Sequence, residues 1–242
     1  GDLSLPPGCE VTYELEAMSI LRQLLDQRMS RSDRARAWYD DFKDRMGERP
    51  RAVEALHKSI SLTGIRSSFR SWLHFVEAQG DLSDDQASLL AGLPGEFLQE
   101  LEVTRMTKSY KMVVLKGMLA HQFPGRIGND ELVAFFKRHA DRSSILKAEL
   151  GRAVDDEAQL RKHIEDNPIA AWIGREASTG QPFFEYANGE FASAFPVDEA
   201  KVVAYRELVE ELVEFRLAEY WQRYREKQGV GDTYVLRVIR NA

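Results

Sequence analysis

The sequence predicts a mainly α-helical protein with a small β component. A helical N-terminal half should be followed by a winged-helix-like unit with a β-hairpin and a long C-terminal helix. Three observations indicate this class. Apolar residues recur at three- and four-residue steps over most of the chain. The pair Asn188-Gly189, which favours tight turns, separates two short aromatic runs typical of strands. Residues 199–228 have an acidic first half and a basic end, which complement a helix dipole.

Residues 1–100 are predicted to form a helical subdomain. Gly47 and Pro50 should end one of its helices, Gly64 should break another, and Ser83 should cap a third. Pro94-Gly95 should open a further short helix. Apart from the short helix that starts at Pro94-Gly95, the helices of this subdomain are expected over residues 11–27, 32–46, 51–62, 65–79 and 83–91.

Residues 101–242 are predicted to form a winged-helix-like nucleic-acid-binding subdomain. A strong helix is expected over residues 109–121, with a break at residues 125–128. Asn129 can cap a helix over residues 130–140, so two helices should flank a short Pro/Gly turn. The remaining expected elements are a helix over residues 154–166 that Asn167-Pro168 stops, a hairpin over 183–195, the long helix 199–228 and a strand over 233–239.

The charge of the chain is unevenly distributed. Residues 105–147, here called the basic island, contain nine Lys or Arg and three Asp or Glu. The chain totals are 33 and 39, so the remaining residues carry 24 basic and 36 acidic side chains. A basic segment in an acidic chain indicates a surface for a polyanion, and nucleic acid is the foremost candidate.

Eight residues of the basic island are predicted to contact nucleic acid. Ser109 or Thr107 could cap the helix that starts there, which would expose N–H groups to a phosphate. Tyr110 could stack on a base or pack inward, and inward packing is commoner. The predicted contact residues are Arg105, Lys108, Tyr110, Lys111, Arg126, Lys137, Arg138 and Arg142. The alternative is a solvated helical face that balances the acidic remainder of the chain.

No motif in the sequence indicates a catalytic centre. A phosphate-binding loop, a serine-hydrolase elbow and paired metal-ligand spacings are all missing, so no cofactor and no metal site are predicted for this chain. Asp155-Asp156-Glu157 reads as a helix start, and Glu185 and Glu190 lack the lysine that usually completes a nuclease motif. The chain has a single cysteine, Cys9, which favours a cytoplasmic protein. It has no apolar run near the ~20 residues of a membrane helix, so no membrane contact is predicted.

Short phrases along the chain resemble a known family. The phrase MTKSYKMVVLK at residues 106–116, GRI at 125–127, SWLHFV at 71–76 and EFRLAEYW at 214–221 are similar to the C-terminal accessory region of bacterial superfamily 2 helicases. These are DEAD/DEAH-type proteins or proteins like the subunits of type III restriction enzymes. The resemblance implies an upstream motor domain that would use ATP and magnesium, and a role in DNA repair, restriction or phage defence.

Three hypotheses for function follow. The first is a non-catalytic module that binds or guides duplex or forked DNA beside a helicase motor, with the hairpin as a wing or strand-separating element. The second is a protein-interaction module that docks the motor to a partner subunit through the acidic part of the C-terminal helix. The third is a metal-dependent nuclease that would use Glu185 and Glu190.

Overall fold

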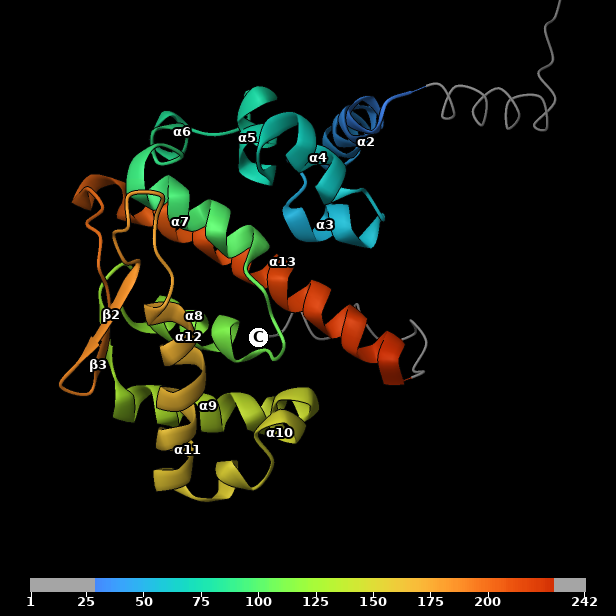
Figure 1. Cartoon of the computed structure of the whole chain (residues 1–242). Helices are drawn as coiled ribbons and strands as arrows, with labels where there is room; N and C mark the ends of the chain where they lie inside the picture. The colour runs from blue at the N-terminus through green and yellow to red at the C-terminus, as the bar shows by residue number, and fades with distance from the viewer. Residues whose placement is uncertain (1–28, 229–242) are drawn as a thin grey trace, which may run out of the picture.

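Helix α13 (Val202–Gln228) is the element on which much of the fold packs. The computed structural model describes residues 29–228, and there α13 contacts α3, α6, α7 and α8 (Figure 1). The helices before α8 are α2 (Arg31–Met46), α3 (Ala52–His57), α4 (Leu62–Phe69), α5 (Trp72–Ala78), α6 (Asp84–Ser88) and α7 (Gly92–Val103). The expected helix over residues 11–27, the expected strand over 233–239 and Cys9 lie outside the described residues.

The N-terminal half is helical as predicted, but several of its boundaries differ. Gly64 lies inside α4 and does not end a helix. Residues 65–79 form parts of two helices, because Arg70 has a positive φ of 76° and Ser71 caps α5. Ser83 is an N-cap as expected, although α6 ends at Ser88. Local apolar spacing continued across these joints, so periodicity alone did not indicate the changes of direction.

The second half contains the predicted long helix and hairpin, and the hairpin belongs to a three-stranded antiparallel sheet. Its order is β1-β3-β2, so the first strand pairs with the last. The elements are α8 (Tyr110–His121), β1 (Arg126–Gly128), α9 (Asn129–Arg142), α10 (Ser144–Leu150), the 3₁₀ turn η1 (Gly151–Asp155), α11 (Glu157–Ile164), the π-helical turn η2 (Glu165–Ile169), α12 (Ala170–Ile173), β2 (Phe184–Ala187), β3 (Glu190–Ser193) and the 3₁₀ turn η3 (Glu199–Lys201).

Two predictions about this half were wrong. The helix break expected at residues 125–128 is present and contains β1, but Gly128 rather than Asn129 is the N-cap of α9. Pro168 does not stop the preceding helix, because η2 carries the chain through Pro168 into α12. A π-helical turn widens the backbone, which lets a proline lie within a continuous helical path. Asp156 caps α11, as the dipole argument predicted.

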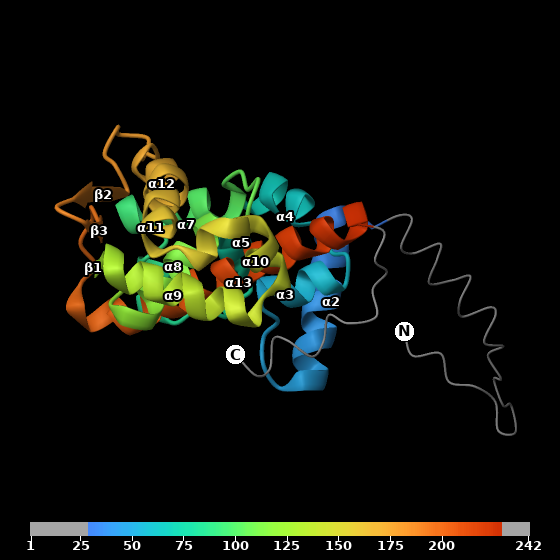
Figure 2. The same cartoon turned by 90° about the horizontal axis from the view of Figure 1, so that it is seen from below.

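An aromatic cluster joins α7, α12 and the hairpin. The ring of Phe97 lies 5.3 Å from that of Phe184, 5.5 Å from Phe195 and 5.8 Å from Trp172. All four side chains are buried. These rings fix the sheet against the helices at one end of the molecule, while α2 lies at the other end (Figures 1 and 2).

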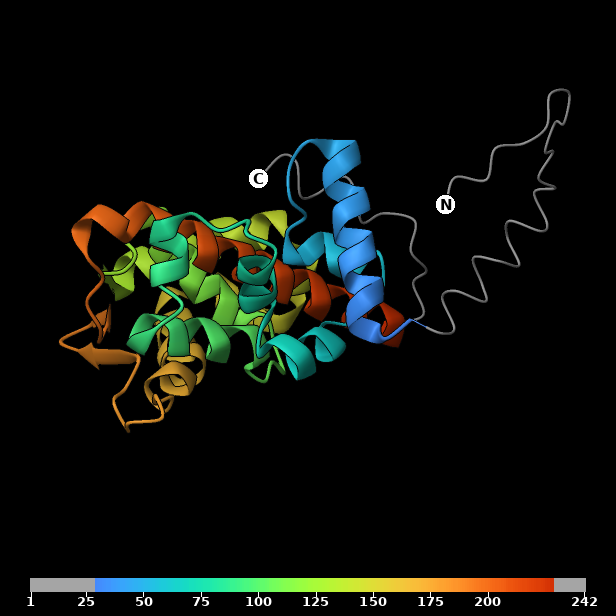
Figure 3. The same ribbon diagram turned by 90° about the horizontal axis from the view of Figure 1, so that it is seen from above.

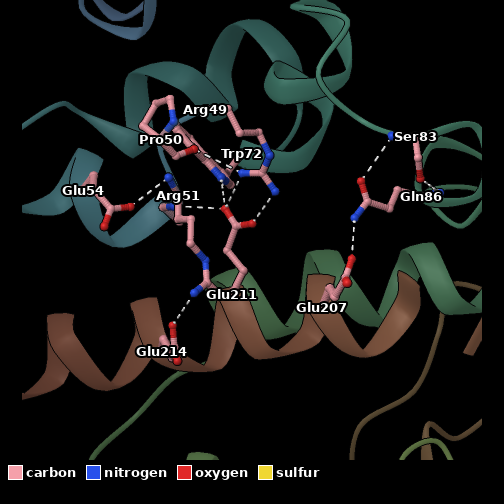
Figure 4. A network of polar contacts seen from close by, with 11 residues as sticks. Arg49, Pro50, Arg51, Glu54, Trp72, Ser83, Gln86, Glu207, Glu211 and Glu214 are labelled. Carbon is pink, nitrogen blue, oxygen red and sulfur yellow. Dashed lines mark hydrogen bonds and ion pairs between the residues drawn. The ribbon is translucent and has the colours of Figure 1, made fainter. Parts of the chain in front are cut away.

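A buried carboxylate attaches the N-terminal helices to α13 (Figure 4). Glu211 is 2% exposed and accepts from both terminal nitrogens of Arg49, at 2.7 and 3.2 Å. It also accepts from the indole of Trp72 at 2.7 Å and from the backbone N–H of Ala52 at 3.0 Å. These four bonds compensate the cost of burying the charge. Figure 3 shows α2 running across the direction of α13.

The predicted division into residues 1–100 and 101–242 stays a prediction. Helix α13 belongs to the second part and contacts α3, α6 and α7 of the first. Buried side chains from both parts belong to one apolar cluster. Across residues 29–228, no helix combines the length and the apolar character needed to cross a membrane.

Candidate nucleic-acid interface

The basic island folds into a pair of closely packed helices, α8 and α9. Gly117 of α8 faces α9, since a Cβ on it would lie 3.0 Å from Leu132 and 3.4 Å from Phe135. His121 at the end of α8 lies 3.8 Å from Glu131 at the start of α9. The helices are therefore antiparallel, and the start of α8 lies at the same end of the pair as the end of α9.

Four of the eight predicted residues are exposed at this end of the pair and form no side-chain bond within residues 29–228. Arg138 and Arg142 lie four residues apart on α9, so they share one helix face. Arg105 and Lys108 lie on the loop that leads into α8. These four side chains are here called the free cations.

Three other predicted residues have partners inside the fold. Lys111 donates to the hydroxyl of Thr104 at 3.0 Å and lies 5.2 Å from the centre of the Trp172 ring. Arg126 pairs with Glu190 at 3.0 Å, and Lys137 lies 3.4 Å from Glu157. These cations already have partners within the protein, so they are less available to a phosphate than the free cations.

The eighth residue, Tyr110, packs inward. It is 6% exposed, and its hydroxyl donates to the backbone carbonyl of Glu149. Of the two fates considered for Tyr110, the structure has the commoner inward packing, which leaves little of the ring exposed for stacking on a base. Burial raises the pKa of Tyr110 well above its ordinary value.

The start of α8 is also not open to a phosphate. The carboxylate of Glu149 accepts from the backbone N–H of Ser109 at 3.1 Å and from the Ser109 hydroxyl. Tyr220 of α13 donates to the same carboxylate. Glu149 thus occupies the position at the helix start where a bound anion was expected.

Two cations lie beside a half-buried histidine on the exposed side of the α8–α9 pair. The ring of His139 stacks on Phe135 at 5.0 Å. Burial, together with the nearby charges of Lys116 and Arg142, lowers the pKa of His139 to about 4. His139 is therefore neutral at pH 7, and the local positive charge comes from its neighbours.

Burial also lowers the pKa of Lys111, to about 8. The nearby charges of Arg175 and Arg216 act in the same direction, while Glu100 opposes them. The ammonium remains mostly charged at pH 7 and carries a desolvation cost. Its contact with the Trp172 ring offsets part of that cost.

The hairpin contains no Lys or Arg over residues 183–195. Its exposed acidic residue is Glu185, while Glu190 pairs with Arg126 of β1. Near the turn of the hairpin, Tyr186 donates to Glu165 at 2.6 Å and fixes that end of the hairpin to η2. A wing of this composition does not attract phosphates by charge. In residues 29–228, no three His, Cys, Asp or Glu side chains are grouped to hold a metal ion, so Glu185 and Glu190 have no third ligand there.

Sequence reasoning missed a second basic surface on the C-terminal half of α13. Arg216 and Arg223 of α13 line one cleft together with Arg66 of α4 and Arg105. The cations of α13 were interpreted only as complements of the helix dipole. Their wide separation in sequence from Arg66 and Arg105 left no local pattern that could have indicated the cleft.

Comparison of the chain with protein-family models, with curated proteins and with solved structures found no match. The functional argument therefore depends on the geometry described above and on the sequence phrases.

Proposed function

We propose that this chain is a non-catalytic module that binds duplex or forked DNA through the free cations at one end of the α8–α9 pair. The mechanism is electrostatic capture of backbone phosphates, with release of the counterions bound to them. Such contacts position DNA and carry no base-sequence information by themselves.

The observation that supports this proposal is the state of the basic island after folding. Of its nine cations, Lys111, Arg126 and Lys137 bond to groups inside the fold. The other six have no side-chain bond within residues 29–228: Arg105, Lys108, Lys116, Arg138, Arg142 and Lys147. These six cations remain available to an external polyanion, which supports the proposal.

The order of elements supports a winged-helix-like arrangement. Strand β1 lies between α8 and α9, and it pairs with β3 in a sheet of order β1-β3-β2. This strand order is the one expected of a winged-helix unit, and the β2–β3 hairpin is its proposed wing. Because the hairpin lacks cations, its proposed role is to meet or separate DNA strands, with Asn188 and Gly189 at its exposed tip.

The proposed setting is the C-terminal region of a helicase-like protein in DNA repair, restriction or phage defence. It is based on the sequence phrases at residues 71–76, 106–116 and 214–221. In this setting, ATP and magnesium belong to an upstream motor domain, which is the proposed partner of the chain, and the compartment is the cytoplasm.

The test is a fluorescence-anisotropy titration of the full chain against duplex, forked and single-stranded DNA. The variant Arg138→Glu/Arg142→Glu should weaken binding by at least about tenfold, because two phosphate contacts become repulsive. Affinity of the unchanged protein should fall steeply as salt rises. The matched control is Arg34→Glu/Lys58→Glu, which makes the same charge change at two exposed cations outside the island.

The control separates a local contact from a general effect of net charge. Equal losses in both double variants would contradict the proposed interface, because only net charge would then matter. Absence of DNA binding by the unchanged protein at low salt would contradict the proposed function itself.

A second candidate function is docking of the motor to a partner subunit through α13. Val203 is 70% exposed, and Glu210 lies seven residues later on the same helix face, also exposed. Other acidic residues of α13 have partners inside the fold: Glu211 binds Arg49, Glu214 binds Arg51 and Glu219 binds Arg216. The change Val203→Asp/Glu210→Lys should weaken binding to a separately expressed motor or partner segment and leave DNA affinity unchanged.

A further inference from the structure

A cleft of about 620 Å³ lies between the loop that joins α7 to α8 and the C-terminal half of α13. That volume is within the range of small-molecule sites, roughly 300–1,000 Å³. Its loop wall consists of residues 103–107, and α13 forms the opposite wall. The charged residues that line it are Arg66, Arg105, Arg216, Arg223, Lys227, Glu102 and Glu219.

Positive charge exceeds negative charge in this lining, five side chains to two. The two carboxylates are already engaged: Glu102 accepts from Arg66 at 3.2 Å, and Glu219 pairs with Arg216. Arg105 and Lys227 are exposed and form no side-chain bond within residues 29–228. The cleft therefore keeps cationic donors for a ligand after its internal pairs are made.

Arg216 is the buried cationic side chain among those that line this cleft. It is 6% exposed, and one of its terminal nitrogens donates to the backbone carbonyl of Thr104. Its Nε is buried and has no partner in the described part of the chain. A buried N–H without an acceptor is unfavourable, and an oxyanion bound at the cleft floor would supply the missing acceptor. Burial lowers the pKa of Arg216, and Arg66 and Arg223 lower it in the same direction.

Two aromatic residues accompany the cations. Tyr220 and Tyr224 line the cleft from α13, and their rings lie 6.3 Å apart. Tyr224 is partly exposed, and its hydroxyl has no bond within residues 29–228. Guanidinium groups beside an accessible aromatic ring recognise a phosphate joined to a flat base.

We propose that this cleft binds a nucleoside phosphate, with the phosphate held by Arg105, Arg216 and Arg223 and the base against Tyr224. The ligand chemistry is the same for a free nucleotide and for the phosphorylated end of a DNA strand. The second case rests on the proposed function, while the first does not.

The experiment measures binding of thymidine monophosphate and of thymidine to the full chain by isothermal titration calorimetry. In parallel, anisotropy compares a short oligothymidylate that carries a 5′-phosphate with one that carries a 5′-hydroxyl. Phosphate should improve binding by about tenfold or more in at least one of the two pairs, since charge-assisted bonds to phosphate are strong. Preference in the first pair alone identifies a free nucleotide, and preference in the second identifies a strand end.

The variant Arg105→Ala/Arg223→Ala should remove this preference for phosphate. Both side chains are accessible, Arg223 being 49% exposed, so the fold should tolerate the change. The control Arg34→Ala/Lys58→Ala removes the same charge elsewhere and should keep the preference. Equal binding of both members in both pairs, or a preference that survives Arg105→Ala/Arg223→Ala, would overturn the proposal.

The two proposals fail in different ways. Loss of duplex binding in Arg138→Glu/Arg142→Glu concerns the α9 face only. Arg105 belongs to both sites, but the phosphate preference compares two ligands that differ only in the phosphate, so its loss in Arg105→Ala/Arg223→Ala concerns the cleft. If the protein binds duplex DNA but shows no preference for phosphate, the proposed function stands and the proposal that the cleft binds a nucleoside phosphate is refuted.

Discussion

A few buried charged side chains hold distant parts of this fold together. Glu211 accepts four bonds from three N-terminal positions, Arg49, Ala52 and Trp72. Its neighbour Glu210 is exposed and forms no side-chain bond within residues 29–228. Adjacent residues of one type thus have opposite roles, and the chain supplies its own control.

Replacement of Glu211 by alanine should strongly destabilise the protein. The change leaves Arg49 and the Trp72 indole without their acceptor, which should lower the free energy of unfolding by about 3–5 kcal/mol. Urea denaturation followed by far-UV circular dichroism measures the loss. The control Glu210→Ala should stay within about 0.5 kcal/mol of the unchanged protein. Similar losses in both variants would contradict the anchoring role of Glu211.

His139 should make the stability of the protein sensitive to acid. Its pKa is about 4 in the folded chain, against an ordinary value of 6.5. Between these pH values the unfolded chain binds the proton and the folded chain does not, so stability falls as pH decreases from 6.5 through 4. In His139→Gln, the fall in unfolding free energy over this range should be smaller. The exposed His57, changed to Gln, should leave the pH profile unchanged.

At the scale of elements, the hairpin turn has the conformation that its sequence favours. Asn188 and Gly189 have positive φ angles of 54° and 77°, as a type I′ turn requires. The carbonyl of Gly189 accepts from the backbone N–H of Asn129 at 2.8 Å, which ties the turn to the start of α9. The turn therefore also fixes where the hairpin tip lies.

Replacement of Gly189 by alanine should cost about 1–2 kcal/mol of stability, because a Cβ disfavours a left-handed backbone. The space around Gly189 is open, so the loss would come from backbone strain and not from a clash. Thermal denaturation followed by circular dichroism measures it. Gly174→Ala is the control: its φ is −85°, the nearest atom to its Cβ lies at 3.6 Å, and its effect should be small. If Gly189→Ala leaves thermal stability unchanged, the argument from backbone strain is wrong.

At the scale of the whole molecule, α13 contacts both parts of the predicted division at residue 100, and the buried side chains belong to one cluster. Residues 29–228 should therefore unfold in one cooperative transition. Trp72 and Trp172 are both fully buried and lie in different parts, so each reports on one of them.

Two variants that retain only Trp72 or only Trp172 test this cooperativity. In each variant, urea unfolding followed by tryptophan fluorescence should coincide with unfolding followed by far-UV circular dichroism. Fluorescence and circular dichroism midpoints that differ within a variant would instead support two separately folding parts, as the division at residue 100 predicts.

Much of the fold could be predicted from local sequence. Helices α2, α8, α9 and α13 and the hairpin follow from apolar spacing, the turn pair and capping residues. The position of β1 could not be predicted, because β1 is defined by its pairing with β3, which is more than 60 residues away. The position of Pro168 inside a helical path could not be predicted either, because it depends on the π-helical turn η2. Short strands have little signal of their own.

The candidate site was predicted in part. The charge count of residues 105–147 identified the segment that carries the proposed interface, and four of the eight residues are free cations in the described chain. The count could not separate Arg138 from Lys137, although they are adjacent, because Lys137 faces Glu157 of a distant helix. Nor could it show that Glu149 and Tyr220 enclose the start of α8.

The helical class, the hairpin turn and the concentration of basic residues in one segment therefore follow from the amino-acid sequence. These properties depend on neighbours a few positions away, whose effects are local propensity, periodicity and net charge. In contrast, packing in three dimensions sets which cations stay free and which carboxylates are buried. It alone brought Arg66, Arg105, Arg216 and Arg223 to one cleft. Pairing and burial depend on residues far apart in the chain, and packing on α13 sets those distances.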